Sequence, residues 1–554
     1  MRIAARRRQL LVVLLAAASG APTLAAQTTL SHLDDAAPVP SGMLRLRVDN
    51  AWTRYDQRFT ADGLAPLNAE LSAYPLGVAQ LPLLASLETG LRTLTGNANT
   101  RISLGRLQVG GDARVVTTPL TLDFGLTSRL TIGVVVPIVQ TRRVAVAHVN
   151  ERKLSPERAN MGFVSAGSRL AAAQNNAAVA AAFQRAADSL SARIARCQQN
   201  PGGTGCAAIN ANASDAAAAR AQAAAFAGAV QALGTDSARA ILAPRAGSQV
   251  AIDVEQQRLA LNQRLQQYLG AGYGAATGVF IAPYDFSYAD LQGRNSTGTT
   301  GLLASTLGGG LDSIHTTERI GLGDVAVRAQ MLVLDNFQHD TLPLQRFQSR
   351  LAVGGLVRFA TSVPDSGRTL TDIGTGDGAG FELRSVMDVI VGHFGSTIAA
   401  RYAKSFARTV SAPLYGDPEA AFPYPVIGPR QRTAGDVFGL DLTPRWLLDE
   451  SFSVDALYGL ERIGASTYDT PPNVPVALCP GCTLPDVATT SGTTRTAQRI
   501  GLGVRYSTLD AYVRRRAPYP VEVSFAHLTT VSGDPGVPKL SREQIRVSIY
   551  YRLR

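Results

Sequence analysis

Little in this 554-residue sequence points to catalysis or to a bound metal. It has only six histidines and four cysteines, and no histidine belongs to an HExxH or other paired ligand motif. The glycine-rich stretch 374–380 follows no buried parallel strand, so it lacks the context of a phosphate-binding loop. His148 or His315 could serve a hydrolase, but spacing marks no nucleophile beside either. We therefore expect no enzyme activity, no catalytic residue, no cofactor and no metal site.

Long apolar runs are also missing. Beyond the N-terminus no segment reaches the ~18 uncharged apolar residues of a transmembrane helix. Residues 1–26 combine a basic start, an apolar core at Leu10–Ala18 and a small-residue cleavage site at Thr23–Ala26, which predicts a signal peptide. A retained anchor is the alternative, but this apolar core is too short to cross about 30 Å of hydrocarbon. We expect cleavage and export of residues 27–554.

Charge is sparse as well, because only 17% of the residues are charged, although the formal net charge is +11. A basic excess can indicate nucleic-acid binding. Here the basic residues are spread along the sequence rather than clustered with aromatic residues, and export separates the chain from nucleic acid. Nucleic acid is therefore not an expected partner.

What the sequence does have is regular alternation of apolar and polar residues. From Ile545 to the C-terminus, for example, apolar residues alternate with Arg546, Ser548 and Tyr550. Successive side chains of a strand face opposite ways, so this pattern makes one apolar and one polar surface. After an export signal, it predicts an antiparallel transmembrane β-barrel with lipid outside and a polar lumen. A soluble β-sandwich also alternates, but its strands have about five or six residues, whereas these runs reach nine or more.

About twelve strands are expected, an even number as in bacterial outer-membrane barrels. Their predicted ranges are Leu44–Phe59, Val115–Phe124, Leu130–Val139, Gly323–Asp335, Ser349–Ala360, Phe381–Val391, Ser396–Ser405, Val437–Leu447, Phe452–Glu461, Gln498–Tyr506, Val521–Leu528 and the C-terminal segment. Short connections alternate with long ones, at roughly 60–103, 141–320, 363–380, 407–435, 465–495 and 530–541. Because short turns of such barrels are periplasmic and long loops extracellular, both termini are predicted to be periplasmic.

The polar face of these strands carries both signs of charge. An arginine toward lipid would cost about 2–4 kcal/mol at the bilayer midplane, so these side chains are predicted to face the lumen. The lumen-lining candidates are Arg45, Arg47, Asp49, Asp123, Asp324, Arg328, Arg350, Arg358, Glu382, Arg384, Asp388, Arg401, Asp441, Arg445, Asp455, Glu461, Arg499, Arg505, Glu522 and Arg546. They could ring a water-filled path and set its selectivity, or pair with one another and fill a narrow barrel.

Residues 150–318 differ from the strands in composition and predict a helical insertion in a long extracellular loop. Helical spacing of apolar residues indicates a helix from Ser168 to about Arg196, a second capped by Ser214 and a third capped by Ser248. The four cysteines form two close pairs, which suits an oxidising compartment. We expect two loop disulfides, Cys197–Cys206 and Cys479–Cys482. The second pair has redox-motif spacing but lies in a proline-rich loop without the following helix.

The connection 60–103 is unusually apolar for an exposed loop, with leucines recurring throughout. Such a segment must fold against something. Two interpretations remain open: it lines the barrel mouth and offers a site for an apolar solute, or it packs beneath the helical insertion.

Three short motifs carry a family resemblance. They are the run from Asp123 to Val134 (DFGLTSRLTIGV), the start of a strand at Gly321–Val325 (GLGDV) and the end of another at Arg358–Thr361 (RFAT). With these motifs the chain resembles the outer-membrane transporter-like proteins associated with the meta-pathway of phenol degradation. The resemblance covers about 120–140 and 320–554. It implies a Gram-negative outer-membrane barrel that passes or senses small hydrophobic or aromatic molecules.

The chain also departs from related patterns. The helical insertion is extra, and Arg554 ends a chain where an aromatic residue is usual. Compared with the long-chain fatty-acid transporters, an N-terminal plug is expected to be missing, because 27–42 is short.

The sequence thus predicts a porin-like passive channel for small solutes in the cell outer membrane. Its expected partners are outer-membrane lipid and lipopolysaccharide, the barrel-assembly machinery and a small-molecule solute. The alternative is a filled structural barrel that serves as a surface scaffold or adhesion platform for the helical insertion.

Overall fold

The computed structural model describes residues 34–151, 159–293, 301–305, 307–337, 347–364, 369–370, 373–420, 422, 426–470 and 487–552. The predicted signal peptide, Cys479, Cys482 and Arg554 lie outside these residues.

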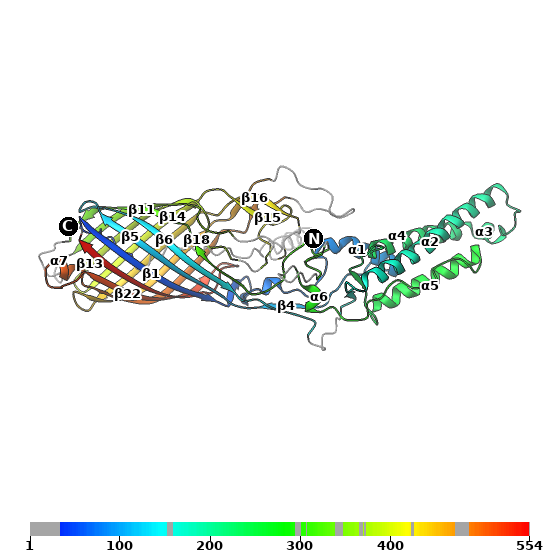
Figure 1. The fold of residues 1–554 in the computed structure, drawn as a ribbon, viewed down its shortest axis with the longest axis horizontal. Helices are drawn as coiled ribbons and strands as arrows, with labels where there is room; N and C mark the ends of the chain where they lie inside the picture. Colours follow the sequence, from blue (N-terminus) through cyan, green and yellow to red (C-terminus); the bar gives the residue numbers. More distant parts are fainter. Residues whose placement is uncertain are drawn as a thin grey trace, which may run out of the picture.

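Twelve antiparallel strands close into a barrel, as the sequence predicts (Figure 1). They are β1 (Met43–Tyr55), β5 (Ala113–Gly125), β6 (Leu130–Arg143), β11 (Ala326–Asp335), β12 (Gln348–Arg358), β13 (Gly380–Val391), β14 (Phe394–Ser405), β17 (Val437–Leu447), β18 (Phe452–Ile463), β21 (Arg495–Ser507), β22 (Val521–Gly533) and β23 (Ser541–Arg552). Each strand pairs with its neighbour in the chain, and β23 pairs with β1 to close the ring.

Most predicted strands differ from the observed ones by a few residues at their ends, β22 for instance reaching Gly533 and not Leu528, and two differ in arrangement. The first was expected to reach Phe59, but β1 ends at Tyr55 and residues 57–66 form a separate hairpin, β2 (Gln57–Thr60) with β3 (Gly63–Pro66). The fourth is longer than expected and interrupted. A short strand, β10 (Thr317–Leu322), and β11 pair with successive parts of β6, and residues 323–325 separate them.

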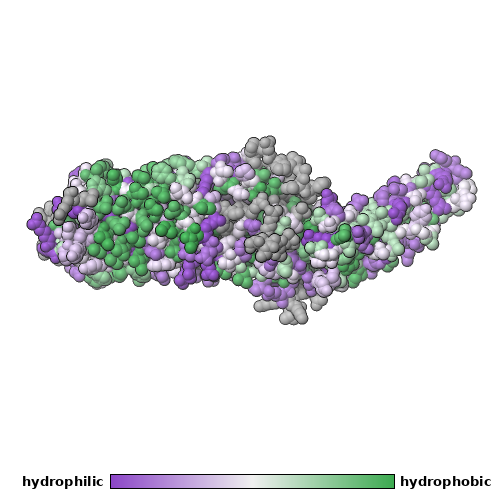
Figure 2. Space-filling model, in the orientation of Figure 1, coloured by the Kyte–Doolittle hydropathy of each residue, from purple (hydrophilic) through white to green (hydrophobic). Residues whose placement is uncertain are grey.

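An apolar belt surrounds the outside of the barrel (Figure 2). One row of the belt crosses five neighbouring strands in register: Leu46, Leu122, Val134, Val327 and Val357. These side chains are exposed, Val134 for instance by 41%, although they are apolar. Exposed apolar side chains in register with buried charged ones on the opposite face are the pattern of a membrane-spanning barrel. Exposed aromatic rings end the belt, and Phe394 stacks on Trp446 with ring centroids 6.0 Å apart.

The two ends of the barrel differ in their connections. At one end lie the short turns, the start of β1, the end of β23 and a small helix, α7 (Leu509–Val513) (Figure 1). At the other end lie the long connections and a four-stranded sheet, β15 (Arg408–Pro413), β16 (Ile427–Thr433), β19 (Ser466–Tyr468) and β20 (Thr490–Ser491). The rule for outer-membrane barrels makes the first end periplasmic and the second extracellular.

A helical arm extends from the extracellular end (Figure 1). Its helices are α1 (Ala85–Thr95), α2 (Arg169–Gln199), α3 (Ala207–Ala211), α4 (Ala213–Leu233), α5 (Gln249–Leu269) and α6 (Tyr288–Leu291), and small pairs of strands join it to the barrel, β4 (Leu107–Gly110) with β7 (Val146–Val149) and β8 (Met161–Phe163) with β9 (Leu242–Pro244). Ser248 caps α5 as predicted, and its hydroxyl accepts a hydrogen bond from Ala251 N. The prediction that Ser214 caps the second helix is wrong, because Asn212 is the N-cap residue of α4. Of the described helices, none is both long and apolar enough to cross a membrane.

The apolar connection 60–103 packs into this arm. Its buried leucines, among them Leu84 and Leu91, share one hydrophobic cluster with Phe183 of α2 and Phe226 of α4, whose rings lie 4.7 Å apart. The second of the two interpretations is therefore observed. Alanine-rich helices have narrow apolar stripes, and these leucines supply the volume that the stripes lack.

The arm carries the predicted disulfide between Cys197 and Cys206, which closes the turn after α2. Replacing both cysteines by serine should lower the stability of the arm by about 2–3 kcal/mol, because the open chain regains the entropy of a short loop. Denaturant unfolding followed by the helical circular-dichroism signal measures this difference. Reductant should bring the native protein to the level of the double variant and leave the variant unchanged. Equal stability of both proteins would contradict the expectation.

Candidate functional site in the barrel lumen

The charged faces of the strands lie inside the barrel. All twenty lumen-lining candidates lie on the face of the sheet opposite the apolar belt, or at the ends of that face. Fourteen of them are buried. The other six are half-buried: Arg328, Arg350, Arg384, Arg445, Arg505 and Glu522. Many pair across strands. Asp123 of β5, for example, contacts Arg45 at 3.0 Å and also Arg328. Glu461 of β18 contacts Arg499 at 2.8 Å and also Arg401.

Not every candidate faces open lumen. Asp324, between β10 and β11, accepts hydrogen bonds from the backbone N of Ser362 (3.1 Å) and of Gly378 (2.8 Å). It therefore holds the backbone at Ser362 and at Gly378 against the barrel rim. At the periplasmic end, the Arg350 guanidinium lies over the ring of Phe337, 3.9 Å from its centroid.

The N-terminal residues Asp34–Gly42, here called the lumen segment, lie within the barrel and not outside it. Gly42 N donates to Gly125 O at the periplasmic turn (2.9 Å), which fixes where the segment enters. Further in, Val39 N donates to Thr131 Oγ1 (2.9 Å) and Ala36 N to Asp388 Oδ2 (2.8 Å). Ala36 and Val39 have no exposed surface.

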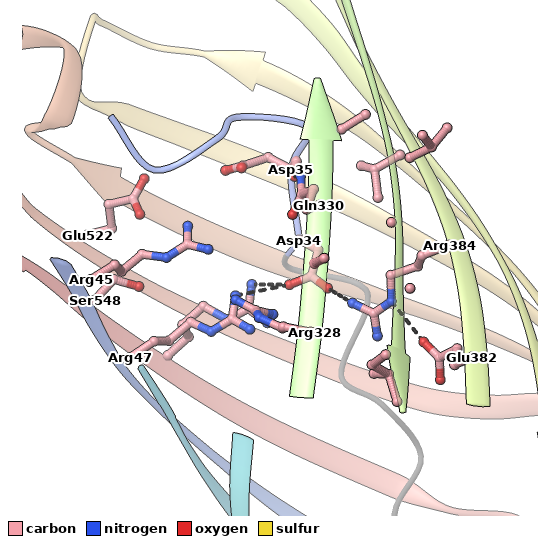
Figure 3. Close-up of a pocket in the computed structure, with 18 of the residues that line it drawn as sticks. Asp34, Asp35, Arg45, Arg47, Arg328, Gln330, Glu382, Arg384, Glu522 and Ser548 are labelled. Atoms are coloured by element: carbon pink, nitrogen blue, oxygen red, sulfur yellow. Dashed lines mark hydrogen bonds and ion pairs between the residues drawn. The ribbon is translucent and has the colours of Figure 1, made fainter. Parts of the chain in front are cut away.

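Two consecutive aspartates hold the inner end of this segment (Figure 3). The carboxylate of Asp34 contacts Arg47 at 3.3 Å, Arg546 at 2.9 Å, and Arg384. Asp35 contacts Arg505 at 2.9 Å. Arginines from several strands thus converge on one short stretch of chain. Charge-assisted hydrogen bonds of this kind are about twice as strong as neutral ones.

The expectation of a missing N-terminal plug is wrong. A segment of nine residues can extend about 30 Å, at some 3.3 Å per residue, which suffices to reach the middle of a membrane-spanning barrel from its periplasmic end. A barrel of twelve strands is narrow, so one extended chain obstructs it. The close approach of the segment requires glycine at 125, because a Cβ there would overlap the carbonyl oxygens of Val39 and Pro40.

Four cavities follow the lumen from one end to the other. The periplasmic one, of about 130 Å³, and the next, of about 50 Å³, share Asp35 and Arg505. A third cavity of about 80 Å³ shares Asp34 with the second. A fourth of about 110 Å³, here called the outer vestibule, shares Arg358 with the third. The lumen segment lines the first three, so it interrupts a series of spaces that the strands themselves leave open.

The outer vestibule lies between the extracellular part of the barrel and the loops above it. Arg358, Arg401 and Arg499 line it from the barrel strands, and Glu419 and Arg432 from the loop region. Glu419 and Arg432 form an ion pair at 3.2 Å. Burial raises the pKa of the Glu419 carboxyl above its usual value, while Arg432 acts in the opposite direction.

The sequence reasoning missed Asp34, Asp35, Thr131 and Gly125 as residues of the lumen. A pair of adjacent acids between the export signal and the first strand, in a chain whose strands are rich in arginine, was the available signal. Arg542 was also missed; it lines the outer vestibule and its Nε donates to Thr53 Oγ1 at 3.1 Å.

No protein-family model matches the chain, and no curated protein does. Among solved structures, it is similar to an outer membrane channel from Pseudomonas putida F1, with 8% identity and a TM-score of 0.38, over 95% of this chain and 100% of that one. It is similar to the P. putida toluene transporter TodX, with 8% identity and a TM-score of 0.23, over 93% and 90%. The monoaromatic hydrocarbon channel CymD gives 7% identity and a TM-score of 0.24, over 97% and 98%. The assignment of the barrel and its lumen therefore depends on the strand register and the side-chain contacts of this chain itself.

Proposed function

We propose that this protein is an outer-membrane channel for the passive passage of small, hydrophobic or aromatic solutes, closed at rest by the lumen segment. One observation carries the proposal: the barrel is obstructed by the lumen segment, which is held through ion pairs and hydrogen bonds. Such an obstruction can leave without disturbing the strands, because its partners are polar and can be hydrated.

The walls of the inner cavities support a preference for apolar solutes. Beside the arginine pairs, the third cavity is lined by Pro119, Val135, Pro137 and Leu356. Apolar side chains beside convergent polar groups are typical of sites that bind small organic molecules. An apolar solute buries its surface against these four side chains, whereas a sugar has no apolar body to bury there.

A structural barrel that displays the helical arm is the second candidate function, and the arm itself favours it. The two candidates make opposite predictions for transport. Purified full-length protein in planar bilayers should show ion conductance at voltages that displace the lumen segment, and in proteoliposomes it should admit toluene faster than a sugar of similar size. A bilayer that stays sealed under all voltages, together with toluene entry no faster than in protein-free vesicles, would reject the channel and leave the scaffold.

A further inference from the structure

The outer vestibule differs from the inner cavities in its balance of charge. Six arginines line it, and four carboxylates: Arg358, Arg401, Arg432, Arg495, Arg499, Arg542, Asp377, Glu382, Glu419 and Glu461. The ion pairs given above engage Glu461 with two of the arginines and Glu419 with a third. The vestibule therefore carries a positive excess in a confined space, where the low dielectric strengthens its attraction for an anion.

Some of its hydrogen-bond donors are buried and unused. The Nε atoms of Arg358 and Arg499 are inaccessible and have no hydrogen-bond partner within the described part of the chain. The two residues are only 9% and 7% exposed. The Nε of Arg495, which also lines the vestibule, is likewise inaccessible and without a hydrogen-bond partner among the described residues. A buried donor without an acceptor costs about 1–3 kcal/mol, so an acceptor in the vestibule gains this energy when the guanidinium turns its Nε toward it.

The remaining wall is apolar. Val437, Ile463, Val537 and Leu540 line the same cavity of about 110 Å³. An inorganic anion would satisfy the arginines but leave this wall in contact with water. A small molecule with an apolar body and one carboxylate would satisfy both surfaces, since guanidinium groups match carboxylates in geometry.

From this arrangement we infer that the outer vestibule is a binding site for small organic anions, an arene carboxylate being the fitting class. The inference rests on the proposed function, because it names the solutes that the channel captures at its extracellular end. Arg358 and Arg499 bind the carboxylate, and the apolar wall receives the ring.

Benzoate is the probe, and benzyl alcohol is its neutral counterpart of nearly the same shape. Calorimetry on detergent-solubilised full-length protein should detect benzoate binding, with benzyl alcohol and inorganic phosphate at least about tenfold weaker. Arg358→Gln and Arg499→Gln should each weaken benzoate by about tenfold or more, the loss of one charge-assisted hydrogen bond, and leave benzyl alcohol unchanged. The benzoate affinity of Arg499→Lys should fall between those of the native protein and of Arg499→Gln, because lysine keeps the charge but lacks Nε.

Arg114→Gln is the matched control. Arg114 lies at the extracellular end of β5 and is exposed on the outer face, so its replacement removes one positive charge without touching the vestibule. It should leave benzoate affinity unchanged. Heat-modifiable gel mobility verifies that each variant is a folded barrel.

Binding and transport separate the two proposals. Equal affinities for benzoate and benzyl alcohol, or benzoate affinity that survives in both glutamine variants, would overturn the vestibule site even if toluene still crosses the membrane. Benzoate bound as expected by a protein that conducts nothing would reject the channel, and the vestibule would then stand as a binding site alone. Phosphate as strong as benzoate would overturn the arene carboxylate in favour of a site for inorganic anions.

Discussion

Deleting residues 34–42 should open the channel: single-channel conductance is expected to rise several-fold, and the current should become anion-selective. The segment obstructs the lumen, so its removal joins the three cavities that it lines. Four arginines then lose their contacts with Asp34 or Asp35, namely Arg47, Arg384, Arg505 and Arg546. The lumen loses two negative charges in this way, and the larger positive excess favours anions in a narrow pore. Planar-bilayer recordings with a salt gradient give both conductance and reversal potential.

Point substitutions test the same closure without shortening the chain. Asp34→Ala combined with Asp35→Ala should give much of the effect of the deletion, because removing one partner of a buried ion pair costs about 3–5 kcal/mol. Gly125→Ala should act in the same direction, since its methyl group displaces the segment at its entry. Asp188→Ala, in an exposed position of α2, is the control and should conduct as the native protein does. If the deletion conducts no better than the control, the lumen segment does not close the pore.

Val134→Arg should destabilise the barrel by about 2–4 kcal/mol, because it places a guanidinium in the middle of the apolar belt. Val134 faces outward, between Leu122 and Val327 on the neighbouring strands. Unfolding by denaturant in lipid vesicles, followed by gel mobility of unboiled samples, gives the free-energy difference.

The neighbouring residue supplies the control for that experiment. Val135 lies on the opposite face of the same strand and lines the third cavity. Val135→Arg introduces the same side chain into the lumen, so it should spare stability and instead reduce conductance. Equal loss of stability in both variants would contradict the assignment of the two faces.

The sequence predicts the strands well because their signal is physical and local. A period of two residues decides which side of a strand meets lipid, and the cost of an arginine in hydrocarbon leaves Arg47 or Arg546 one direction to face. The same signal can miss where a strand stops or shifts. Between Leu332 and Leu334 the register of β11 against β12 shifts, which places two successive residues on the outside. Nothing in the apolar pattern marks that bulge.

The candidate site was harder to predict, for a different reason. Asp34 and Asp35 have no periodicity, and their role depends on arginines up to 512 positions away in the chain. The leucines of 60–103 indicated burial correctly, but their partner could not be chosen from the sequence. The helices that cover them are rich in alanine, and only the assembled arm shows that their stripes are too narrow to pack alone.

The helical arm has a consequence for what a cell carrying this protein presents to its surroundings. A helix of 31 residues, such as α2, is about 46 Å long at 1.5 Å per residue. Its far end, tied by Cys197–Cys206, therefore stands well clear of the headgroup layer. A molecule that approaches along the axis of the arm therefore meets this tip before it meets the loops over the barrel (Figure 1).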